Sequence, residues 1–123
     1  EWKDSADVVL CDVPCSGLGI IRKKPEIRFK NPDEIRTLPE IQARILANCA
    51  QYVKKGGTLV YSTCTILQRE NEDVVRAFLT ENMEFEAVSW THPVCGERAD
   101  GMVTLLPPVH NTDGFFIAKM YRK

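Results

Sequence analysis

An acid and two thiols are the residues of this chain whose types and spacing best suit covalent chemistry. Asp12 and Cys15 follow one short apolar run, and Cys64 follows another. Short apolar runs bounded by turn signals are typical of buried strands, and Pro14, which has no backbone N–H, ends the first of them. Ligands of open α/β sheets bind beyond the carboxyl ends of the strands. We therefore predict that the three side chains face one pocket, provided that the two strands are parallel neighbours.

A strand–helix–strand unit is expected to position these residues. The strands are predicted at Val8–Asp12 and Thr58–Ser62, and the helix between them runs from Pro39 to about Lys55, where a glycine pair stops it. The buried face of this helix is expected at every fourth position, namely Ile41, Ile45, Cys49 and Val53. Crossover units of this kind are almost always parallel, which places both thiols at one edge of the sheet.

The downstream segments are expected to complete an α/β sheet. A second helix begins at a cluster of acids, whose charge suits the positive end of a helix dipole: Glu70, Glu72 and Asp73. A third strand is predicted within Phe85–Trp90, and Met102–Leu106 and Phe115–Met120 are expected to form an antiparallel pair that closes the sheet edge. The segment Gly17-Leu18-Gly19 lacks the third glycine of a dinucleotide-binding loop. The chain, residues 1–123, is therefore interpreted as the second half of an α/β fold.

Composition restricts the class of protein. The chain has 123 residues, of which 44% are hydrophobic and 27% charged, as in globular domains with a modest core. Its formal net charge of −1 does not indicate a nucleic-acid binder overall, so any such surface is local. Five cysteines without a CxxC pair, with two histidines, argue against a disulfide framework or a metal site and for a reducing compartment. No apolar run reaches membrane-spanning length, and we predict a cytoplasmic protein.

One reaction uses two thiols and an acid in a single pocket. Carbon 5 of a pyrimidine is too electron-poor to attack a methyl donor, but addition of a thiolate at carbon 6 turns it into a nucleophilic enamine carbon. A carboxylic acid near ring nitrogen 3 stabilises the charge that develops there. A base then removes the carbon 5 proton, and the thiol is eliminated. A free thiol reacts poorly until its pKa is lowered, and the sequence does not show whether either cysteine is tuned in this way.

Three segments resemble the motifs of the RNA cytosine-5 methyltransferases. Residues 12–26 are similar to motif IV of that family, and Tyr61–Thr65, followed by Glu70-Asn71, is similar to motif VI. Leu106-Pro107 and Asp113–Lys119 resemble its closing motif. The details are most similar to the bacterial 16S rRNA branch, the RsmB/Sun type. The resemblance implies the C-terminal half of a Rossmann-like, S-adenosylmethionine-dependent methyltransferase fold, with parallel strands and an antiparallel C-terminal strand pair.

The family's residue roles carry over by position. The resemblance implies that Cys64 is the nucleophile on cytosine carbon 6, that Cys15 assists release of the adduct, and that Asp12 contacts the ring near nitrogen 3 and the cofactor. The substrate-binding residues that it implies are Pro14, Ser16, Arg22, Lys23 and Lys24. The implied cofactor is S-adenosylmethionine, most of whose site would lie upstream, together with N-terminal RNA-binding domains.

The substrate implied by the resemblance is 16S rRNA or a small-subunit precursor, methylated at carbon 5 of a cytosine. A transfer RNA is the alternative substrate. In an alternative mechanism Cys15 is the nucleophile, as is the Pro-Cys of DNA cytosine methyltransferases. A non-catalytic RNA-binding or assembly module and a thiol redox protein are alternatives from other classes. By itself the chain is expected to be inactive and to self-associate through an exposed apolar edge of its sheet.

Overall fold

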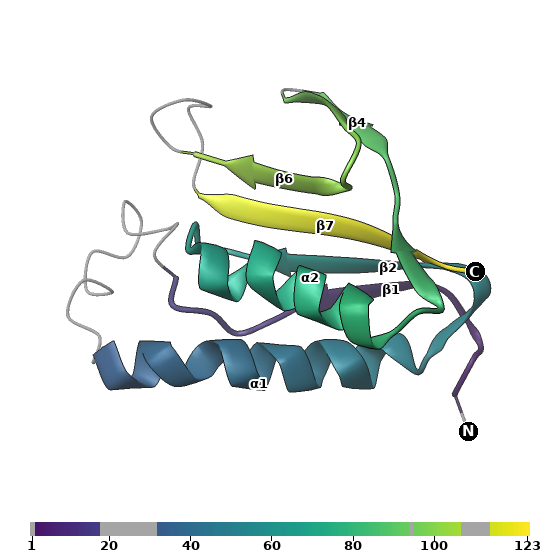
Figure 1. Ribbon diagram of the computed structural model, residues 1–123, viewed down its shortest axis with the longest axis horizontal. Helices are drawn as coiled ribbons and strands as arrows, with labels where there is room; N and C mark the ends of the chain where they lie inside the picture. The colour runs from purple at the N-terminus through teal and green to yellow at the C-terminus, as the bar shows by residue number, and fades with distance from the viewer. Residues whose placement is uncertain (1, 18–31, 94, 107–113) are drawn as a thin grey trace.

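A mixed sheet with two helices on one face forms the described part of the chain (Figure 1). The computed structural model describes residues 2–17, 32–93, 95–106 and 114–123. In chain order the elements are β1 (Ala6–Asp12), α1 (Pro32–Ala50), β2 (Val53–Thr63), the short 3-10 helix η2 (Gln68–Glu70), α2 (Glu72–Glu81), β3 (Phe85–Ala87), β4 (Trp90–His92), β5 (Gly96–Arg98), β6 (Met102–Leu105) and β7 (Phe115–Arg122). The main sheet has the strand order β1-β2-β7-β3 with β6 also paired to β7, while β4 and β5 form a separate sheet. The predicted α/β class, with parallel strands and an antiparallel C-terminal pair, is confirmed.

Strands β1 and β2 are parallel neighbours, as predicted. Their register places Cys11 opposite Tyr61 and Asp12 opposite Ser62. Just beyond this pairing, the Val13 N–H donates to the Ser62 carbonyl over 3.2 Å. Adjacent strands lie about 4.8 Å apart, so the segments that follow these two strands leave the sheet side by side. Both predicted catalytic thiols lie in those segments.

Helix α1 differs from the predicted helix at both ends and in its buried face. It begins at Pro32, contains Pro39 in its interior and ends at Ala50. Of the four residues expected on its buried face, Ile45 and Cys49 pack against the core, Val53 belongs to β2, and Ile41 is 40% exposed. Gln42, by contrast, is fully buried. A pattern that assigns every polar residue to the solvent face misplaces Gln42, because its amide finds hydrogen-bond partners inside the protein.

The glycine pair after α1 belongs to a strand and does not end the helix. Gly56 and Gly57 lie within β2, beside a shift in the register of β1 and β2 between Ala6 and Val8. An irregularity of this kind needs backbone conformations that side chains rarely adopt, and Gly56 supplies one with φ of +83°. Gly56 and Gly57 therefore allow the irregular backbone at the start of β2.

Strand β7 lies inside the sheet, whereas its pair with β6 was expected at the edge. It pairs antiparallel with β6, as predicted, and the register places Met102 opposite Ala118. It also pairs antiparallel with β2 and with β3, so it joins three strands of the sheet. The predicted third strand is confirmed over Phe85–Ala87, and Trp90 instead opens the hairpin of β4 and β5.

The hydrophobic core lies between the sheet and the helices. Its buried members include Leu59 and Tyr61 on β2, Phe116 and Met120 on β7, Leu46 on α1, and Val75 and Phe78 on α2. The rings of Tyr61 and Phe116 meet edge to face, with their centroids 6.2 Å apart. This contact packs β2 against β7 a few residues before the segment that carries the second thiol.

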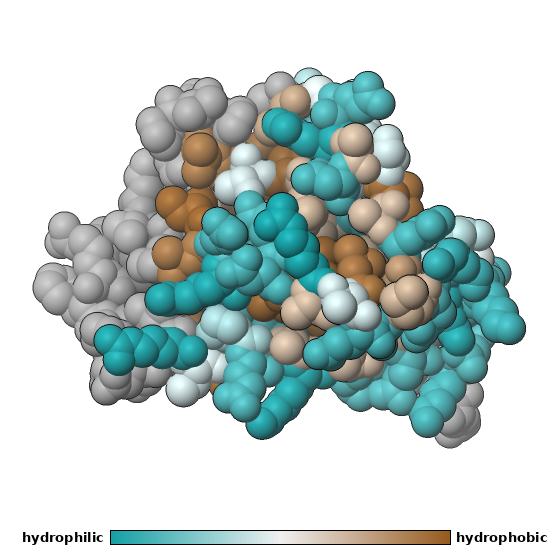
Figure 2. Space-filling view, in the orientation of Figure 1, coloured by the Kyte–Doolittle hydropathy of each residue, from teal (hydrophilic) through white to brown (hydrophobic). Residues whose placement is uncertain are grey.

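The face of the sheet opposite the helices is apolar and open in the described part of the chain. On β1, which has a described partner on one side only, Val8 and Leu10 are 63% and 67% exposed. A groove of about 480 Å³ on this face is lined by Val8, Thr58, Val60, Trp90, Ile117 and Lys119. The outer surface of the helices is, by contrast, largely hydrophilic (Figure 2).

The Leu10→Lys substitution is expected to reduce self-association of the chain. The wild type is expected to dimerise or aggregate, because exposed apolar edge strands pair with other chains and a charge at the edge opposes that pairing. Light scattering over a concentration series measures the effect. Met83, which is 74% exposed between α2 and β3, gives the matched control Met83→Lys. A wild-type chain that stays a monodisperse monomer at high concentration would contradict this prediction.

Candidate active site

Cys15 and Cys64 meet where their two segments leave the sheet. Their Sγ atoms are 3.0 Å apart, and the backbone N–H of Cys64 donates to Cys15 Sγ over 3.3 Å. Both cysteines are free thiols of intermediate exposure. The parallel pairing of β1 and β2 thus brings together two thiols that are 49 residues apart in the sequence.

Asp12 lies at the same edge of the sheet and is exposed to solvent. Its Oδ1 accepts a 3.0 Å hydrogen bond from Ser62 Oγ, its partner across the parallel pair. The carbonyl of Pro14 accepts a 3.0 Å hydrogen bond from Gln42 Nε2 on α1, which leaves a second lone pair on that oxygen. The site therefore combines two thiols, an accessible carboxylate and a backbone acceptor.

A buried carboxylate joins the two segments that carry the thiols. Glu70 is fully buried in η2, and its oxygens accept hydrogen bonds from the Ser16 N–H at 2.8 Å, Ser16 Oγ at 2.8 Å, Gln42 Nε2 at 3.0 Å and Thr65 Oγ1 at 3.2 Å. Ser16 and Thr65 are the residues that directly follow the two cysteines. One carboxylate thus contacts the chain immediately after each thiol.

Asn71 and Tyr61 hold the second of these segments. The Oδ1 of Asn71 accepts a 2.6 Å hydrogen bond from Thr63 Oγ1, and its Nδ2 donates to the Thr65 carbonyl over 2.9 Å. The hydroxyl of Tyr61 donates to the Glu70 carbonyl over 2.6 Å. The second thiol therefore lies between two threonines that are anchored to the same asparagine.

Burial makes the Cys64 thiol hard to ionise. Desolvation, together with the hydrogen bond to Cys15, raises the pKa of Cys64 from 9.0 to about 12. Desolvation also raises the pKa of Cys11, a core thiol that is hydrogen-bonded to Cys49. At neutral pH the site therefore holds Cys64 in its thiol form, and a thiolate forms there when the proton passes to another group.

Alkylation of Cys64 by iodoacetamide is expected to be slow at neutral pH and to rise with pH. Only the thiolate reacts, so a pKa of about 12 makes Cys64 at pH 8 roughly a thousandfold less reactive than a thiol at the ordinary 9.0. Its rate should rise about tenfold per pH unit up to the pKa. Peptide mapping by mass spectrometry measures the rate, with the urea-unfolded chain as control. Equal rates in the folded and unfolded chains would rule out the expected effect.

The structure brings three of the predicted site residues together: Asp12, Cys15 and Cys64. Ser16 is fully buried, and its hydroxyl bonds inward to Glu70 and Thr65. Its expected contact with substrate stays a prediction. The basic residues Arg22, Lys23 and Lys24 lie outside the described residues.

Two residues of the site could not be assigned from their local pattern. By sequence, Gln42 belongs to the polar face of a helix, and Glu70 to the acids that begin the next helix. Both are fully buried. The sequence contains one indication that Glu70 belongs to the site: it lies beside Asn71, within the segment that resembles motif VI.

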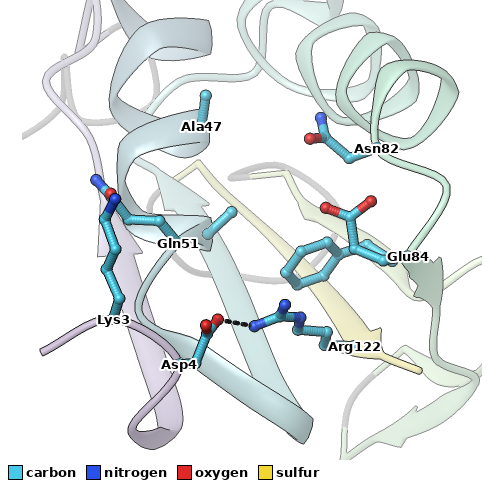
Figure 3. Close-up of a pocket in the computed structure, with 9 residues that line it drawn as sticks. Lys3, Asp4, Ala47, Gln51, Asn82, Glu84 and Arg122 are labelled. Atoms are coloured by element: carbon cyan, nitrogen blue, oxygen red, sulfur yellow. Dashed lines mark hydrogen bonds and ion pairs between the residues drawn. The ribbon is translucent and has the colours of Figure 1, made fainter.

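A separate hollow lies at the other end of the strands, away from the thiols. Its volume is about 250 Å³, and it is lined by Lys3, Asp4, Ala47, Ala50, Gln51, Asn82, Glu84, Phe85 and Arg122. Asp4 and Arg122 form an ion pair there (Figure 3). The Arg122 guanidinium holds the pKa of Asp4 below its usual value and also donates to the Val53 carbonyl. These contacts tie the start of the chain to β7 and β2.

Neither a cluster of metal-ligating side chains nor a membrane-spanning helix is present among the described residues. No group of three or more histidine, cysteine or acidic side chains among them is arranged to hold a metal ion. None of the helices in that part of the chain has both the length and the apolar character needed to cross a bilayer.

Comparison with known proteins assigns this chain to a protein family. The family model described as 16S rRNA methyltransferase RsmB/F matches residues 2–121. The chain belongs to this family. A relative from Bacillus subtilis (strain 168), "Probable ribosomal RNA small subunit methyltransferase B", is 46% identical over 123 residues, which covers 95% of this chain and 28% of the relative. The chain thus spans less than a third of that relative's length.

Solved structures support the fold. The crystal structure of PH0851 matches with a TM-score of 0.90 at 37% identity, over 98% of this chain and 27% of that one. NSun6 from Pyrococcus horikoshii with SFG matches with a TM-score of 0.77 at 27% identity, over 92% of this chain and 29% of that one. The methyltransferase fold implied by the sequence resemblance is confirmed, and the paired thiols are the candidate active site of an RsmB/F methyltransferase.

Proposed function

We propose that this chain is the C-terminal, substrate-facing part of a catalytic domain that methylates carbon 5 of a cytosine in 16S rRNA. The observation that carries this function is the 3.0 Å contact between Cys15 and Cys64, at the same strand edge as the exposed Asp12. Membership of the RsmB/F family supports methyl transfer to rRNA. Because the chain spans 28% of the Bacillus subtilis relative, the complete activity is proposed for a longer protein whose upstream half holds most of the cofactor.

Cys64 supplies the nucleophile in this mechanism. As a thiolate, its Sγ forms a bond to cytosine carbon 6, and the ring electrons move toward carbon 5. Its raised pKa means that the proton must first pass to an acceptor. Cys15 Sγ lies 3.0 Å away, and in its ionised form it can take that proton directly. Proton transfer between the two thiols thus generates the nucleophilic thiolate within the site.

Cys15 acts a second time when the product is released. After methyl transfer, carbon 5 carries both a methyl group and a proton, and the bond between carbon 6 and Cys64 persists until that proton leaves. Once Cys15 has lost its own proton to solvent, it removes the carbon 5 proton. The electron pair re-forms the ring double bond, and Cys64 leaves as a thiolate. General base assistance of this kind typically contributes 10²–10⁴-fold.

Asp12 and Pro14 are proposed to hold the base. As a carboxylic acid, Asp12 donates a hydrogen bond to ring nitrogen 3, where negative charge develops when carbon 6 is attacked. The second lone pair of the Pro14 carbonyl accepts from the exocyclic amine. The side-chain oxygens of Asp12 are exposed beside the thiols and can also face a sulfonium cation, so the residues present fit S-adenosylmethionine. When bound, that cofactor supplies an electrophilic methyl group.

The proposed partner is 16S rRNA or a small-subunit precursor. Arg22, Lys23 and Lys24 form a local basic cluster close in sequence to Cys15, and they are proposed to contact phosphates. Binding through such contacts weakens as salt rises. A nearly neutral chain can bind RNA in this way because the basic residues are concentrated in one short stretch of the sequence.

Methyl transfer to RNA tests the proposed function. The protein, with the upstream portion that its relatives possess, is incubated with labelled S-adenosylmethionine and either unmodified 16S rRNA or transfer RNA. Bisulfite sequencing then locates the product. We expect a stable methyl group at carbon 5 of one cytosine of the 16S rRNA. Label in transfer RNA alone would instead identify the alternative substrate, and RNA binding without transfer would support a non-catalytic module.

A further inference from the structure

The residues on both sides of each catalytic thiol are held by buried hydrogen bonds. Before Cys15, the Pro14 carbonyl is bound by Gln42, and after it Ser16 is bound twice by Glu70. The two residues that flank Cys64 are both bound by Asn71, and Thr65 Oγ1 also contacts the Glu70 carboxylate. The thiols themselves are half-buried and contact each other at 3.0 Å.

Glu70 is the residue that connects the two sets of contacts. Its Oε1 accepts from the Ser16 N–H and from Gln42 Nε2, and its Oε2 faces the hydroxyls of Ser16 and Thr65. It therefore bonds to the first thiol's segment, the second thiol's segment and α1. Tyr61 holds the backbone of Glu70 in turn, with its hydroxyl 2.6 Å from the carbonyl.

An acceptor-only group suits this position. Each of the four contacts of the carboxylate is with an N–H or O–H group, and an ionised carboxylate accepts all of them. A buried charge is a costly way to gain stability, since apolar residues of similar volume often stabilise a core as well or better. Its direct bonds to the residues beside both thiols indicate a role in geometry.

We propose that Glu70 is a positioning residue that keeps the Cys15 and Cys64 thiols within direct proton-transfer distance. This inference deepens the proposed function and rests on it for any effect on turnover. The thiol separation itself is a property of the fold and is measurable without activity. Loss of the carboxylate removes the acceptor that the two segments share and leaves the direct Ser16–Thr65 and Cys64–Cys15 hydrogen bonds to join them. The thiols then spend a smaller fraction of their time close enough to exchange a proton.

Capture of both thiols by one arsenic atom tests this geometry. Phenylarsine oxide binds two close thiols as a dithioarsenite, and peptide mapping by mass spectrometry identifies the bridged pair. The protein with its upstream portion is used as wild type, Glu70→Ala, Glu70→Gln and, as a matched control, Glu72→Gln. We expect the yield of the Cys15–Cys64 bridge to fall at least about tenfold in Glu70→Ala and to stay near wild type in Glu72→Gln.

The Glu70→Gln variant separates positioning from charge. Glutamine keeps the shape, and its NH₂ group can face the hydroxyls of Ser16 and Thr65, which are able to accept as well as donate. We therefore expect this variant to restore most of the bridging. Thr65→Val, which removes one donor at constant volume, is expected to lower bridging to an intermediate level and serves if Glu70→Ala does not fold. Wild-type bridging in a folded Glu70→Ala or Thr65→Val variant would overturn the proposal.

Steady-state kinetics link this geometry to turnover. For a folded Glu70→Ala variant we expect kcat to fall at least about tenfold with KM for RNA nearly unchanged, because proton transfer is affected and RNA binding is not. A variant whose bridging falls while KM alone changes would argue against a role in positioning. If the wild type bridges its thiols but transfers no methyl group, the proposed function fails while the structural role of Glu70 stands.

Discussion

Replacing Cys64 by serine is expected to abolish both methyl transfer and the covalent protein–RNA adduct. A serine hydroxyl is a far weaker nucleophile than a thiolate, and loss of a catalytic nucleophile typically costs at least about a thousandfold in rate. The adduct is measured on the protein with its upstream portion, incubated with 5-fluorocytidine-substituted 16S rRNA and S-adenosylmethionine. Fluorine on carbon 5 cannot leave as a proton, so the wild-type adduct should persist as a band that resists denaturation.

Cys15→Ser is the matched control for this experiment. If Cys15 both takes the Cys64 proton and acts in release, this variant should form the adduct more slowly than the wild type. With natural cytidine it should accumulate an adduct that the wild type resolves. A band that is lost in Cys15→Ser but kept in Cys64→Ser would exchange the two roles. Absence of a band in the wild type, with cofactor binding intact, would point to a different RNA or to a non-catalytic module.

Replacing Phe116 by alanine is expected to destabilise the domain by about 3–5 kcal/mol. Phe116 is fully buried on β7 and packs edge to face against Tyr61. Truncation removes its apolar contacts and leaves a cavity between the sheet and the helices. The midpoint of urea unfolding of the protein, followed by circular dichroism, measures the loss of stability.

The neighbouring Phe115 provides the control. It is of intermediate exposure and, one position away on the same strand, it points to the opposite face of the sheet. The Phe115→Ala substitution should cost less than half as much as Phe116→Ala, because less apolar area leaves water on folding. Equal losses for the two variants would show that the helix-covered face is not the dominant core.

Local pattern was sufficient to predict the elements that carry the chemistry. The apolar runs before Asp12 and Cys64 are strands, and the connecting helix makes them parallel neighbours. The antiparallel pair of β6 and β7 also follows from two short apolar runs with proline, asparagine and glycine residues between them in the sequence. These features depend on neighbours in the sequence, so they can be predicted from short windows.

The phase of α1 and the place of the glycine pair could not be predicted in this way. A short apolar repeat is consistent with a small range of orientations of a helix: Ile45 and Cys49 pack against the core as expected, but Gln42 is buried in place of Ile41. Gln42 is buried because Pro14 and Glu70, from two distant segments, satisfy its amide. The sequence around Gly56 is consistent with the end of a helix and with the irregular start of a strand. The pairing of β2 with β1 decides between these two structures.

The sequence by itself determined the class of fold, the strand-end placement of Asp12, Cys15 and Cys64, and the family resemblance that links them to methyl transfer. The tertiary structure alone decided that the two thiols lie 3.0 Å apart and that a buried Glu70 joins their segments. The physical reason is that separation and burial depend on strand register and on hydrogen-bond partners dozens of residues away. A local sequence pattern contains neither.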